Sequence, residues 1–361
     1  MISIIGAGPA GSYLAYLLAN TGKKVQIFEE HKTIGNPVQC TGIVTSEFQE
    51  IMEPKKEFTI NQTNKARIFS LSGKCIDLKL GKDNHILDRY KFDSYLADKA
   101  QKAGAEFFPE SKFISGNKDF FIIKQKDKLK KIKKEILIGA DGPLSSVAKS
   151  YGMYGKRKLV LGFQYRAYMG NDNAIEFYPG RGIYSWIVPE SKNIVRIGIG
   201  DYISKGIKKQ FDEFLKFKQI KKKDIIEAQA GLIPMYSIPN KIQKNNAFLI
   251  GDAACQVKAT TGGGIVPGLI AAKALSKAII ENKSYYQLTR KLRKELIIHM
   301  LARRIMDNFS KNDWDFLFRL FENKKNMEIL ETIEREKISK IAVPLLRNDP
   351  RFLYFAKNLF F

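Results

Sequence analysis

The chain opens with the sequence ISIIGAGPAG at residues 2–11, in which an apolar run leads directly into three spaced glycines. A stretch with helical spacing follows, and the strand-like VQIF at residues 25–28 then ends at Glu29. In such a turn the first glycine allows the sharp bend, the second lets the backbone approach a pyrophosphate, and the third lets helix and strand pack closely. This order predicts a dinucleotide-binding βαβ unit; the alternative is a glycine-rich turn in a βαβ unit without a ligand.

The same pattern, an apolar strand followed directly by glycines and an acidic residue, occurs at two further places, and we call each of the three a junction. The two further junctions are GADG at residues 139–142 and GDAA at residues 251–254, and the latter leads through TTGGG at residues 260–264 into a helical stretch. Because the carboxyl ends of parallel strands meet at one edge of a sheet, we expect all three junctions to face one crevice. A single GxGxxG suits NAD or FAD equally, and the third junction discriminates between them. Its aspartate at a strand end, followed by Gly-Gly-Gly at the start of a helix, suits a second phosphate and ribityl contact, as in the longer flavin dinucleotide.

The stretches between the junctions have the alternation of β-strands. Residues 66–80 alternate on either side of a Ser-Gly turn and predict a β-hairpin. Residues 120–124 and 135–138 are expected to form the arms of a second hairpin with a lysine run at its tip. The alternation from 159 to 201 predicts an antiparallel sheet with one covered face, and residues 286–361 are predicted to be mostly helical.

The composition is that of a globular protein of 361 residues, but the formal charge is +24. Lysine supplies most of this charge, in runs at residues 124–134 and 216–223. Such a charge favours anionic lipid headgroups, phosphorylated substrates or nucleic acid, and a solvated surface without a partner is the simplest alternative. No nucleic-acid-binding signature accompanies it, so we expect no nucleic acid partner.

Other classes of site and location find no support in the sequence. The three cysteines and three histidines lie far apart, which predicts neither a disulfide framework nor a metal site. No stretch reaches the ~18 apolar residues of a spanning helix. No signal peptide precedes the first strand, so we expect a cytoplasmic protein.

Together the motifs resemble those of a known family. The glycine turn with its terminal acid, LDR at residues 87–89 with the following FD, and the two later junctions resemble the FAD-dependent hydroxylase and oxidoreductase superfamily. Three stretches narrow the resemblance to the geranylgeranyl reductase family: GNPVQC (35–40), GDAACQVKATTGGG (251–264) and YPGRGIYSWIVP (178–189), the last similar to that family's Tyr-x-Trp-x-x-Pro substrate motif. The resemblance covers about residues 1–290.

The resemblance implies an α/β fold, with a GxGxxG-type FAD-binding Rossmann-like domain, an inserted antiparallel β-sheet substrate domain and a C-terminal helical region. The expected boundaries are 1–57, 81–155 and 240–285 for the discontinuous FAD-binding domain, 58–80 and 156–239 for the sheet domain, and 286–361 for the helical region.

The resemblance also implies contacts to FAD. The glycine turn would hold the pyrophosphate, Arg89 and Asp252 would reach its phosphate or ribityl region, and the backbone near Phe113 would meet the adenine. The implied set is Gly6, Gly8, Pro9, Ala10, Gly11, Glu29, Cys40, Thr41, Ile43, Arg89, Phe113, Asp252, Gly263, Gly264 and Ile265. The chain departs from the family after Cys40, where Thr41-Gly42-Ile43 stands in place of a Gly-Gly or Gly-Glu-Gly sequence.

The implied activity is reduction of isolated C=C bonds in the geranylgeranyl chains of archaeal-type membrane lipids, by hydride transfer from N5 of reduced flavin. A long isoprenoid chain requires an apolar tunnel, and aromatic residues of the antiparallel sheet are candidates to line it. They are Tyr184, Trp186, Phe163, Tyr165 and Phe177, with ordinary core packing as the alternative. Cys40 is the candidate catalytic residue, as a proton relay or a gate for the flavin; the alternative is a small buried loop residue.

Two other functions stay open. A flavin-dependent aromatic hydroxylase would share the fold but use NAD(P)H and oxygen on a short polar pocket. A nucleic-acid-acting flavoprotein is suggested by charge alone. For the reductase, the electron donor is expected to be ferredoxin or NAD(P)H. The lysine runs and a set of C-terminal apolar residues predict peripheral docking on an anionic membrane, with a tail that folds back on the core as the alternative. These residues are Phe352, Leu353, Phe355, Phe360 and Phe361.

Overall fold

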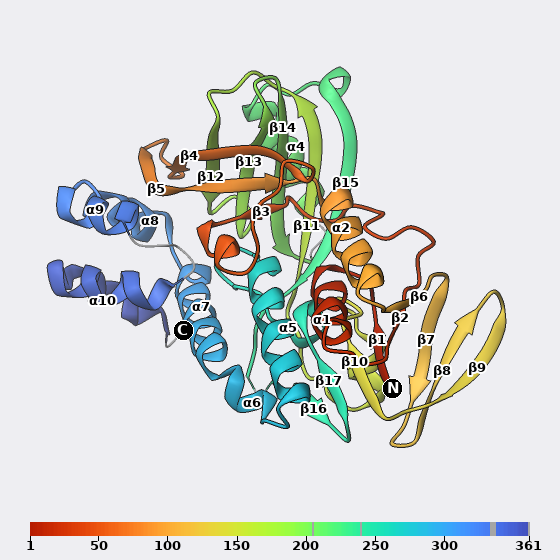
Figure 1. Cartoon of the computed structure of the whole chain (residues 1–361). Coiled ribbons are helices and arrows are strands. Elements are labelled where there is room, and N and C mark those ends of the chain that lie inside the picture. The colour runs from red at the N-terminus through yellow and green to blue at the C-terminus, as the bar shows by residue number, and fades with distance from the viewer. Residues whose placement is uncertain (204–205, 239, 333–336, 360–361) are drawn as a thin grey trace. The chain divides into compact units, whose positions relative to one another are not determined.

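The computed structural model describes residues 1–203, 206–238, 240–332 and 337–359, which fold into two compact units (Figure 1). The first unit comprises Met1–Val38, Asp88–Lys158 and Ile233–Ile297, and the second comprises Gln39–Leu87, Leu159–Leu232 and Ile298–Phe361. Residues 39–57 and 81–87, expected in the cofactor domain, therefore group with the sheet, as does most of the C-terminal region.

The first unit is built on a six-stranded sheet in the order β16-β17-β10-β1-β2-β6. Its strands are β1 (Ile2–Ile5), β2 (Val25–Phe28), β6 (Glu106–Phe108), β10 (Ile136–Gly139), β16 (Gln243–Lys244) and β17 (Ala247–Leu249). All neighbours pair in parallel except β16. Since β17, β10 and β1 are adjacent, the three glycine junctions follow the carboxyl ends of three neighbouring strands, and the Rossmann-like fold predicted from the sequence is confirmed.

Helices of the first unit begin where the sequence signals favour them. α1 (Pro9–Ala19) has a proline in its first turn, and α2 (Arg89–Lys102) is capped by Asp88, whose carboxylate accepts a 3.1 Å hydrogen bond from the Lys91 N–H. α5 (Ile265–Ile280) buries a run of small and apolar side chains and packs against α1. The remaining short helices are α3 (Ser146–Ser150), α6 (Tyr285–Leu288) and the 3₁₀ turn η3 (Gly251–Ala254).

The predicted hairpin around the lysine run is wrong in its second arm. The lysines themselves form β9 (Lys128–Lys133), which pairs with β8 (Phe120–Gln125) beside β7 (Ser111–Gly116). Lys126 and Asp127 make the tight turn, with φ of 45° and 63°. The following residues, 136–139, are apolar throughout and form the buried strand β10 of the parallel sheet instead.

The second unit is built on an eight-stranded, mainly antiparallel sheet in the order β15-β11-β14-β13-β12-β4-β5-β3. Its strands are β3 (Ile43–Val44), β4 (Thr59–Phe69), β5 (Cys75–Leu87), β11 (Leu159–Tyr168), β12 (Ala174–Pro179), β13 (Tyr184–Ser191), β14 (Ile194–Tyr202) and β15 (Ile225–Pro234). The predicted β4–β5 hairpin is confirmed, and it joins the larger sheet through a parallel pairing of β4 with β12.

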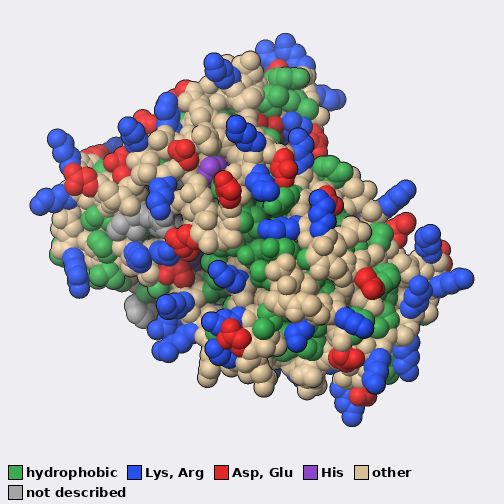
Figure 2. Space-filling model, viewed as in Figure 1, with side chains coloured by type: hydrophobic (Ala, Val, Ile, Leu, Met, Phe, Trp, Pro, Cys, Tyr) green, Lys and Arg blue, Asp and Glu red, His purple; other side chains and the backbone are tan. Residues whose placement is uncertain are grey.

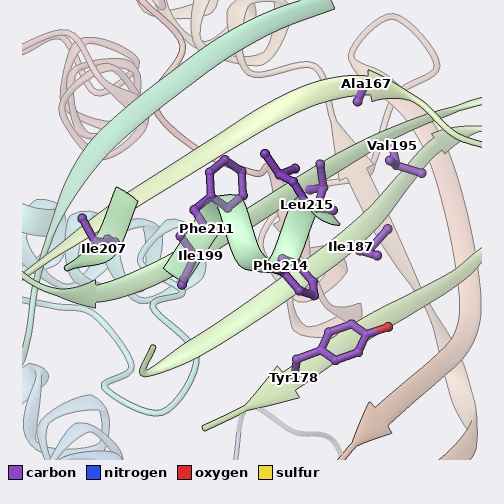
Figure 3. Packing of buried hydrophobic residues seen from close by; sticks show 10 residues of the cluster. Ala167, Tyr178, Ile187, Val195, Ile199, Ile207, Phe211, Phe214 and Leu215 are labelled. Atoms are coloured by element: carbon purple, nitrogen blue, oxygen red, sulfur yellow. The ribbon is translucent and has the colours of Figure 1, made fainter. Parts of the chain in front are cut away.

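One face of this sheet is covered, as predicted, and the helix that covers it is α4 (Ile207–Phe217). Phe211 and Phe214 of α4 are fully buried against residues of β11 to β14 (Figure 3). The C-terminal helices belong largely to this unit, and Trp314 and Phe318 of α8 pack on the β4–β5 hairpin. These C-terminal helices are α7 (Arg290–Asp307), α8 (Lys311–Leu320), α9 (Lys324–Thr332) and α10 (Ile338–Asn348), followed by the 3₁₀ segment η4 (Pro350–Leu359). Two further 3₁₀ segments, η1 (Ser46–Glu50) and η2 (Lys222–Asp224), lie earlier in the chain. None of the helices in the described ranges combines the length and apolarity that crossing a bilayer requires.

Candidate functional site

The glycine turn after β1 is shaped by two close backbone approaches. A Cβ on Gly6, whose φ is +100°, would lie 2.3 Å from the Ala140 carbonyl oxygen, and a Cβ on Gly11 would lie 2.1 Å from the Gly6 carbonyl oxygen. The absence of a side chain at Gly6 therefore lets the first junction contact the second, and its absence at Gly11 lets α1 pack closely against the end of β1. Gly8 is different, because nothing lies within 4 Å of the position that its Cβ would take. Open backbone at the start of a helix is the arrangement that a pyrophosphate needs.

Glu29 connects the end of β2 to this turn. Its carboxylate accepts hydrogen bonds from the Ala7 N–H at 2.8 Å and from the His31 N–H at 2.9 Å. The side chain also lines a cavity of about 270 Å³, together with Thr33, Ser94 and other residues of the loop after β2 and of α2. Glu29 therefore lies beside an open space large enough for part of a nucleotide, next to the turn that would hold the phosphates.

Asp252 belongs to η3, at the third junction, and its side chain reaches the N-terminal end of α5. A Cβ on Gly264, the N-cap of α5, would lie 2.9 Å from Asp252 Oδ1, and a Cβ on Gly263 would lie 2.9 Å from Lys258 Cε. No residue that the structure describes donates a hydrogen bond to the Asp252 carboxylate. Burial raises the pKa of Asp252 to about 6, although the positive charges of Arg89 and Arg157 act in the opposite direction. A ligand with hydroxyl groups would supply the missing donors.

Replacement of Asp252 by asparagine is expected to stabilise the ligand-free protein at neutral and basic pH only. Because the folded-state pKa lies above the ordinary value of 3.8, the wild type loses stability as the pH rises from about 4 to above 6. Asp252→Asn removes this loss, which is worth roughly 3 kcal/mol at about 1.4 kcal/mol per pKa unit. Urea unfolding of the ligand-free wild type and Asp252→Asn near pH 4 and pH 8 measures the difference. If Asp252→Asn and the wild type had the same free energy of unfolding near pH 8 as well as near pH 4, the prediction would be wrong.

Two arginines organise the surroundings of Asp252. Arg89, at the start of α2, makes hydrogen bonds of 3.0 and 2.8 Å to the carboxylate of Asp93, which is buried. Arg157 donates to the Pro143 carbonyl at 2.9 Å and to the Ala253 carbonyl at 2.8 Å, so that it ties the second junction to the third. The sequence motifs assigned no role to Asp93 or Arg157; the Arg-Asp spacing of four residues was the available signal for Asp93.

The remaining residues implied by the resemblance divide between the two units. Pro9, Ala10 and Ile265 lie at the starts of α1 and α5, where Ala10 Cβ lies 3.2 Å from the place of a Cβ on Gly251. Phe113 is buried in β7 of the first unit and stacks on Phe121. Cys40, Thr41 and Ile43 belong to the second unit, with Ile43 in β3.

The face of the large sheet away from α4 carries Trp186, and we call it the Trp186 face. The indole lies directly over Gly198 of β14, because a Cβ there would lie 2.4 Å from Trp186 Cζ2. Its Nε1–H donates a 3.1 Å hydrogen bond to Gln164 Oε1. Tyr184 lies beside it, with ring centroids 5.6 Å apart, and Phe177 packs on the same cluster. The packing around the indole is largely apolar, and the buried carboxamide of Gln164 supplies the acceptor for its N–H.

The five aromatic residues expected to line a tunnel do not share a face. Phe163 and Tyr165 point to the opposite side of β11, where their rings lie 5.2 and 5.1 Å from the ring of Phe211 in α4. Successive residues of a strand point to opposite faces, so Gln164, between them, reaches the Trp186 face instead. Tyr184, Trp186 and Phe177 are therefore brought together, and Phe163 and Tyr165 form part of the core under α4.

The loop that carries Cys40 is attached to the Trp186 face by two buried side chains. The Thr41 hydroxyl donates a 2.9 Å hydrogen bond to Gln164 Oε1. Arg196 donates to the Thr41 carbonyl and, at 3.2 Å, to the Leu87 carbonyl, while its Nε pairs with Glu190. Sequence reasoning missed Gln164 and Arg196; the available signal was a polar residue within an otherwise apolar strand.

The comparisons with known proteins agree with this architecture. A family model described as an NAD(P)-binding Rossmann-like domain matches residues 4–42. A protein of Methanocaldococcus jannaschii named digeranylgeranylglycerophospholipid reductase is 29% identical, with 99% of this chain and 97% of the relative covered. Solved structures also share the fold, and two of them illustrate the similarity.

One is a geranylgeranyl bacteriochlorophyll reductase-like protein from Thermoplasma acidophilum, with a TM-score of 0.81 and 23% identity over 99% of this chain and 98% of that chain. The other is a flavin-dependent brominase, with a TM-score of 0.74 and 16% identity over 99% of each chain. The resemblance drawn from the motifs at about residues 1–290 is confirmed, and the alignments extend it to 99% of the chain.

Proposed function

We propose that this full-length relative of digeranylgeranylglycerophospholipid reductases is a FAD-dependent reductase that saturates C=C bonds in the geranylgeranyl chains of archaeal-type membrane lipids. The observation that carries the proposal is the pairing of two features in one chain. The first unit has three glycine junctions at the ends of adjacent strands and a buried carboxylate, Asp252, to which no described residue donates a hydrogen bond. The second unit has an apolar aromatic face around Trp186. The name of the relative that aligns over the full length supplies the substrate class.

The residues of the first unit fit a flavin dinucleotide. Gly8 leaves backbone open for a pyrophosphate, and Glu29 borders a cavity beside the same turn, where the adenosine would lie. No described residue donates a hydrogen bond to the Asp252 carboxylate, and ribityl hydroxyls would provide the donors. Gly263, Gly264 and Ile265 would present backbone N–H groups at the start of α5. When bound and reduced, FAD supplies the hydride for the alkene.

The protein's own contribution is to bind, orient and exclude water. Tyr184, Trp186 and Phe177 offer an apolar surface to an isoprenoid chain, and the hydrogen bond to Gln164 fixes the plane of the Trp186 indole. Gln164 is itself held by a 2.7 Å hydrogen bond from its Nε2 to Gln229 Oε1. Since Gln164 also accepts from Thr41, one carboxamide sets the positions of the substrate face and of the Cys40 loop.

Cys40 is proposed to relay the proton that the second alkene carbon requires. Cys40→Ala is then expected to lower kcat by at least about tenfold while flavin content stays unchanged. Cys75→Ala, at an exposed position in β5, serves as the control, and Cys40→Ser should restore part of the rate. Steady-state turnover and the flavin-to-protein absorbance ratio measure both quantities. Full flavin content with wild-type turnover in Cys40→Ala would remove Cys40 from the chemistry.

Turnover assays separate the reductase from a hydroxylase that shares the fold. The purified, flavin-loaded protein is supplied with a reductant and either digeranylgeranylglycerophospholipid or a phenol, and the products are identified by mass spectrometry. The reductase predicts hydrogenated lipid and no oxygenated phenol. Oxygenated phenol with rapid NADPH consumption and unchanged lipid would assign the chemistry to the hydroxylases.

A lipid substrate makes an anionic membrane the proposed docking partner. Figure 2 shows Lys and Arg side chains spread over the visible surface, and Lys128, Lys130, Lys131 and Lys133 of β9 are all exposed. Of the C-terminal residues expected to dock, Phe355 is buried against Phe309, whereas Leu353 is 61% exposed. Phe360 and Phe361, which were also expected to dock, lie outside the described residues.

Replacement of the four exposed β9 lysines by glutamine is expected to weaken vesicle binding by about 1 kcal/mol per lysine, because each contributes that much near an anionic surface. Co-sedimentation with vesicles that contain anionic phospholipid measures the effect, and vesicles of neutral phosphatidylcholine serve as the control. Binding that does not depend on anionic lipid would contradict the electrostatic account.

A further inference from the structure

The C-terminal part of α7 brings an arginine to the second unit's sheet. The hydroxyl of Tyr202 in β14 donates a 2.6 Å hydrogen bond to Asp307 Oδ2, and Arg303 Nε donates a 2.8 Å hydrogen bond to Asp307 Oδ1. Arg303 is only 5% exposed. The aspartate therefore satisfies one edge of the guanidinium and anchors α7 to the strand. The sequence motifs covered about residues 1–290 and gave no indication of this contact.

One terminal nitrogen of this guanidinium, Nη1, has no hydrogen-bond partner in the part of the chain that the structure describes. Arg303 Nη1 is buried and, among the described residues, has no hydrogen-bond acceptor. An unsatisfied buried donor of a charged group is costly, and native proteins keep few of them without a functional reason. Asp307 is already shared with Tyr202, so it does not turn to this nitrogen.

A second donor without a partner lies on the same face. Tyr184 pairs with Gly200 across β13 and β14, and Tyr202 is two residues further along β14, so both tyrosines leave the sheet on the Trp186 face. No described residue hydrogen-bonds to the Tyr184 hydroxyl. Burial raises the pKa of this hydroxyl and the charge of Arg303 opposes that shift, which places the two groups within electrostatic reach of one another.

We propose that Arg303, assisted by the Tyr184 hydroxyl, binds an oxyanion of the substrate, namely the phosphate of the prenyl lipid. A guanidinium edge and a phenolic O–H are donors, and Arg matches the geometry of phosphate oxygens. An isoprenoid chain alone offers them no acceptor. The inference rests on the proposed function, and it adds that the enzyme selects phosphorylated over neutral prenyl lipids through α7.

Substrate preference tests the proposal. The flavin-loaded wild type, Arg303→Met and the control Arg304→Met, an exposed neighbour on α7, are assayed with digeranylgeranylglyceryl phosphate and with neutral digeranylgeranylglycerol. The ratio of kcat/KM for the phosphorylated over the neutral lipid should fall by about tenfold or more in Arg303→Met and stay at the wild-type value in Arg304→Met. An unchanged ratio in Arg303→Met would overturn the proposal.

A binding measurement keeps the inference separate from the proposed function. Sodium phosphate, compared with sodium chloride at equal ionic strength, should raise the Tm of the wild type and of Arg304→Met but not of Arg303→Met. If no lipid is reduced but this shift is seen, the proposed function fails and the oxyanion site stands. If lipid is reduced and phosphate shifts all three proteins equally or none of them, the oxyanion site fails, because Arg303 then plays no part in binding phosphate.

Discussion

Gly11→Ala is expected to yield a protein that has lost both stability and flavin binding. The new Cβ would lie 2.1 Å from the Gly6 carbonyl oxygen, a backbone atom that cannot move away without distorting the turn. Overpacking of this severity costs roughly 3 kcal/mol or more. Because the distorted backbone is also the pyrophosphate site, visible flavin absorbance should be lost in the purified protein. Urea unfolding and the absorbance spectrum measure the two effects.

The matched control is Gly8→Ala in the same turn. Nothing lies within 4 Å of its Cβ position, and its backbone conformation, with φ −68°, suits any L-residue. We expect its free energy of unfolding to stay within about 0.5 kcal/mol of the wild type, while its methyl group obstructs a cofactor that approaches the backbone. A stable, colourless Gly8→Ala beside an unstable Gly11→Ala would separate the ligand site from the fold. A fully flavin-loaded Gly8→Ala would contradict the assignment of the turn to the pyrophosphate.

Gly198→Ala is the second substitution with a large expected effect. Its Cβ would lie 2.4 and 2.5 Å from indole carbons of Trp186 and 2.7 Å from Gln164 Cβ, so the indole must leave its place. We expect a loss of about 2 kcal/mol in stability. We also expect kcat/KM for the lipid to fall by tenfold or more, because misplaced substrate-binding groups lose that much. Flavin binding should be unaffected.

Gly200→Ala, two residues along the same strand and on the same face, is the control. Its Cβ would meet Val160, Trp186 and Tyr184 at 3.5 to 3.6 Å, which is ordinary van der Waals contact. The fluorescence of Trp186, measured in a Trp314→Phe background, should change in Gly198→Ala and not in Gly200→Ala. Equal lipid turnover in both variants would show that the Trp186 face does not bind the substrate.

The sequence predicts the first unit well because its signals are local. A tight turn, a close approach and a helix start each require glycine or proline at a fixed offset, so the junctions at Gly6, Gly139 and Gly251 could be placed at strand ends from a few residues each. Their adjacency in the order β17-β10-β1 then follows from the rules of parallel sheets.

Pairing between distant strands is where sequence reasoning fails. The lysine run and residues 136–139 can both form short strands, so the pattern does not show which of them pairs with β8. Only the apolar, buried character of residues 136–139 distinguishes β10, a strand of the parallel sheet, from the lysine strand β9. The parallel joint between β4 and β12 has no local signature at all. Alternation along β11 shows that Phe163 and Tyr165 share one face. Whether this is the face that carries Trp186 depends on how β11, β14 and β13 pair, and the sequence alone does not give that register.

The polar residues that organise the second unit are hidden for a similar reason. Gln164 and Arg196 each have a partner more than a hundred residues away, in the hydrogen bonds from Thr41 to Gln164 and from Arg196 to the Leu87 carbonyl. Arg303 pairs with the nearby Asp307, but Asp307 is joined to the sheet by Tyr202, which lies more than a hundred residues earlier in the chain. A single polar residue in an apolar strand indicates a buried partner, but it does not identify that partner.

The central claim is that a bound flavin reduces the double bonds of a geranylgeranyl lipid. Its most direct test is a single-turnover reaction without oxygen, in which the FAD-loaded protein is reduced chemically and mixed with digeranylgeranylglycerophospholipid. We predict that the absorbance of oxidised flavin returns and that the lipid gains one pair of hydrogens for each flavin oxidised. Flavin that stays reduced in the presence of the lipid, or reoxidises without any change in lipid mass, would contradict the claim.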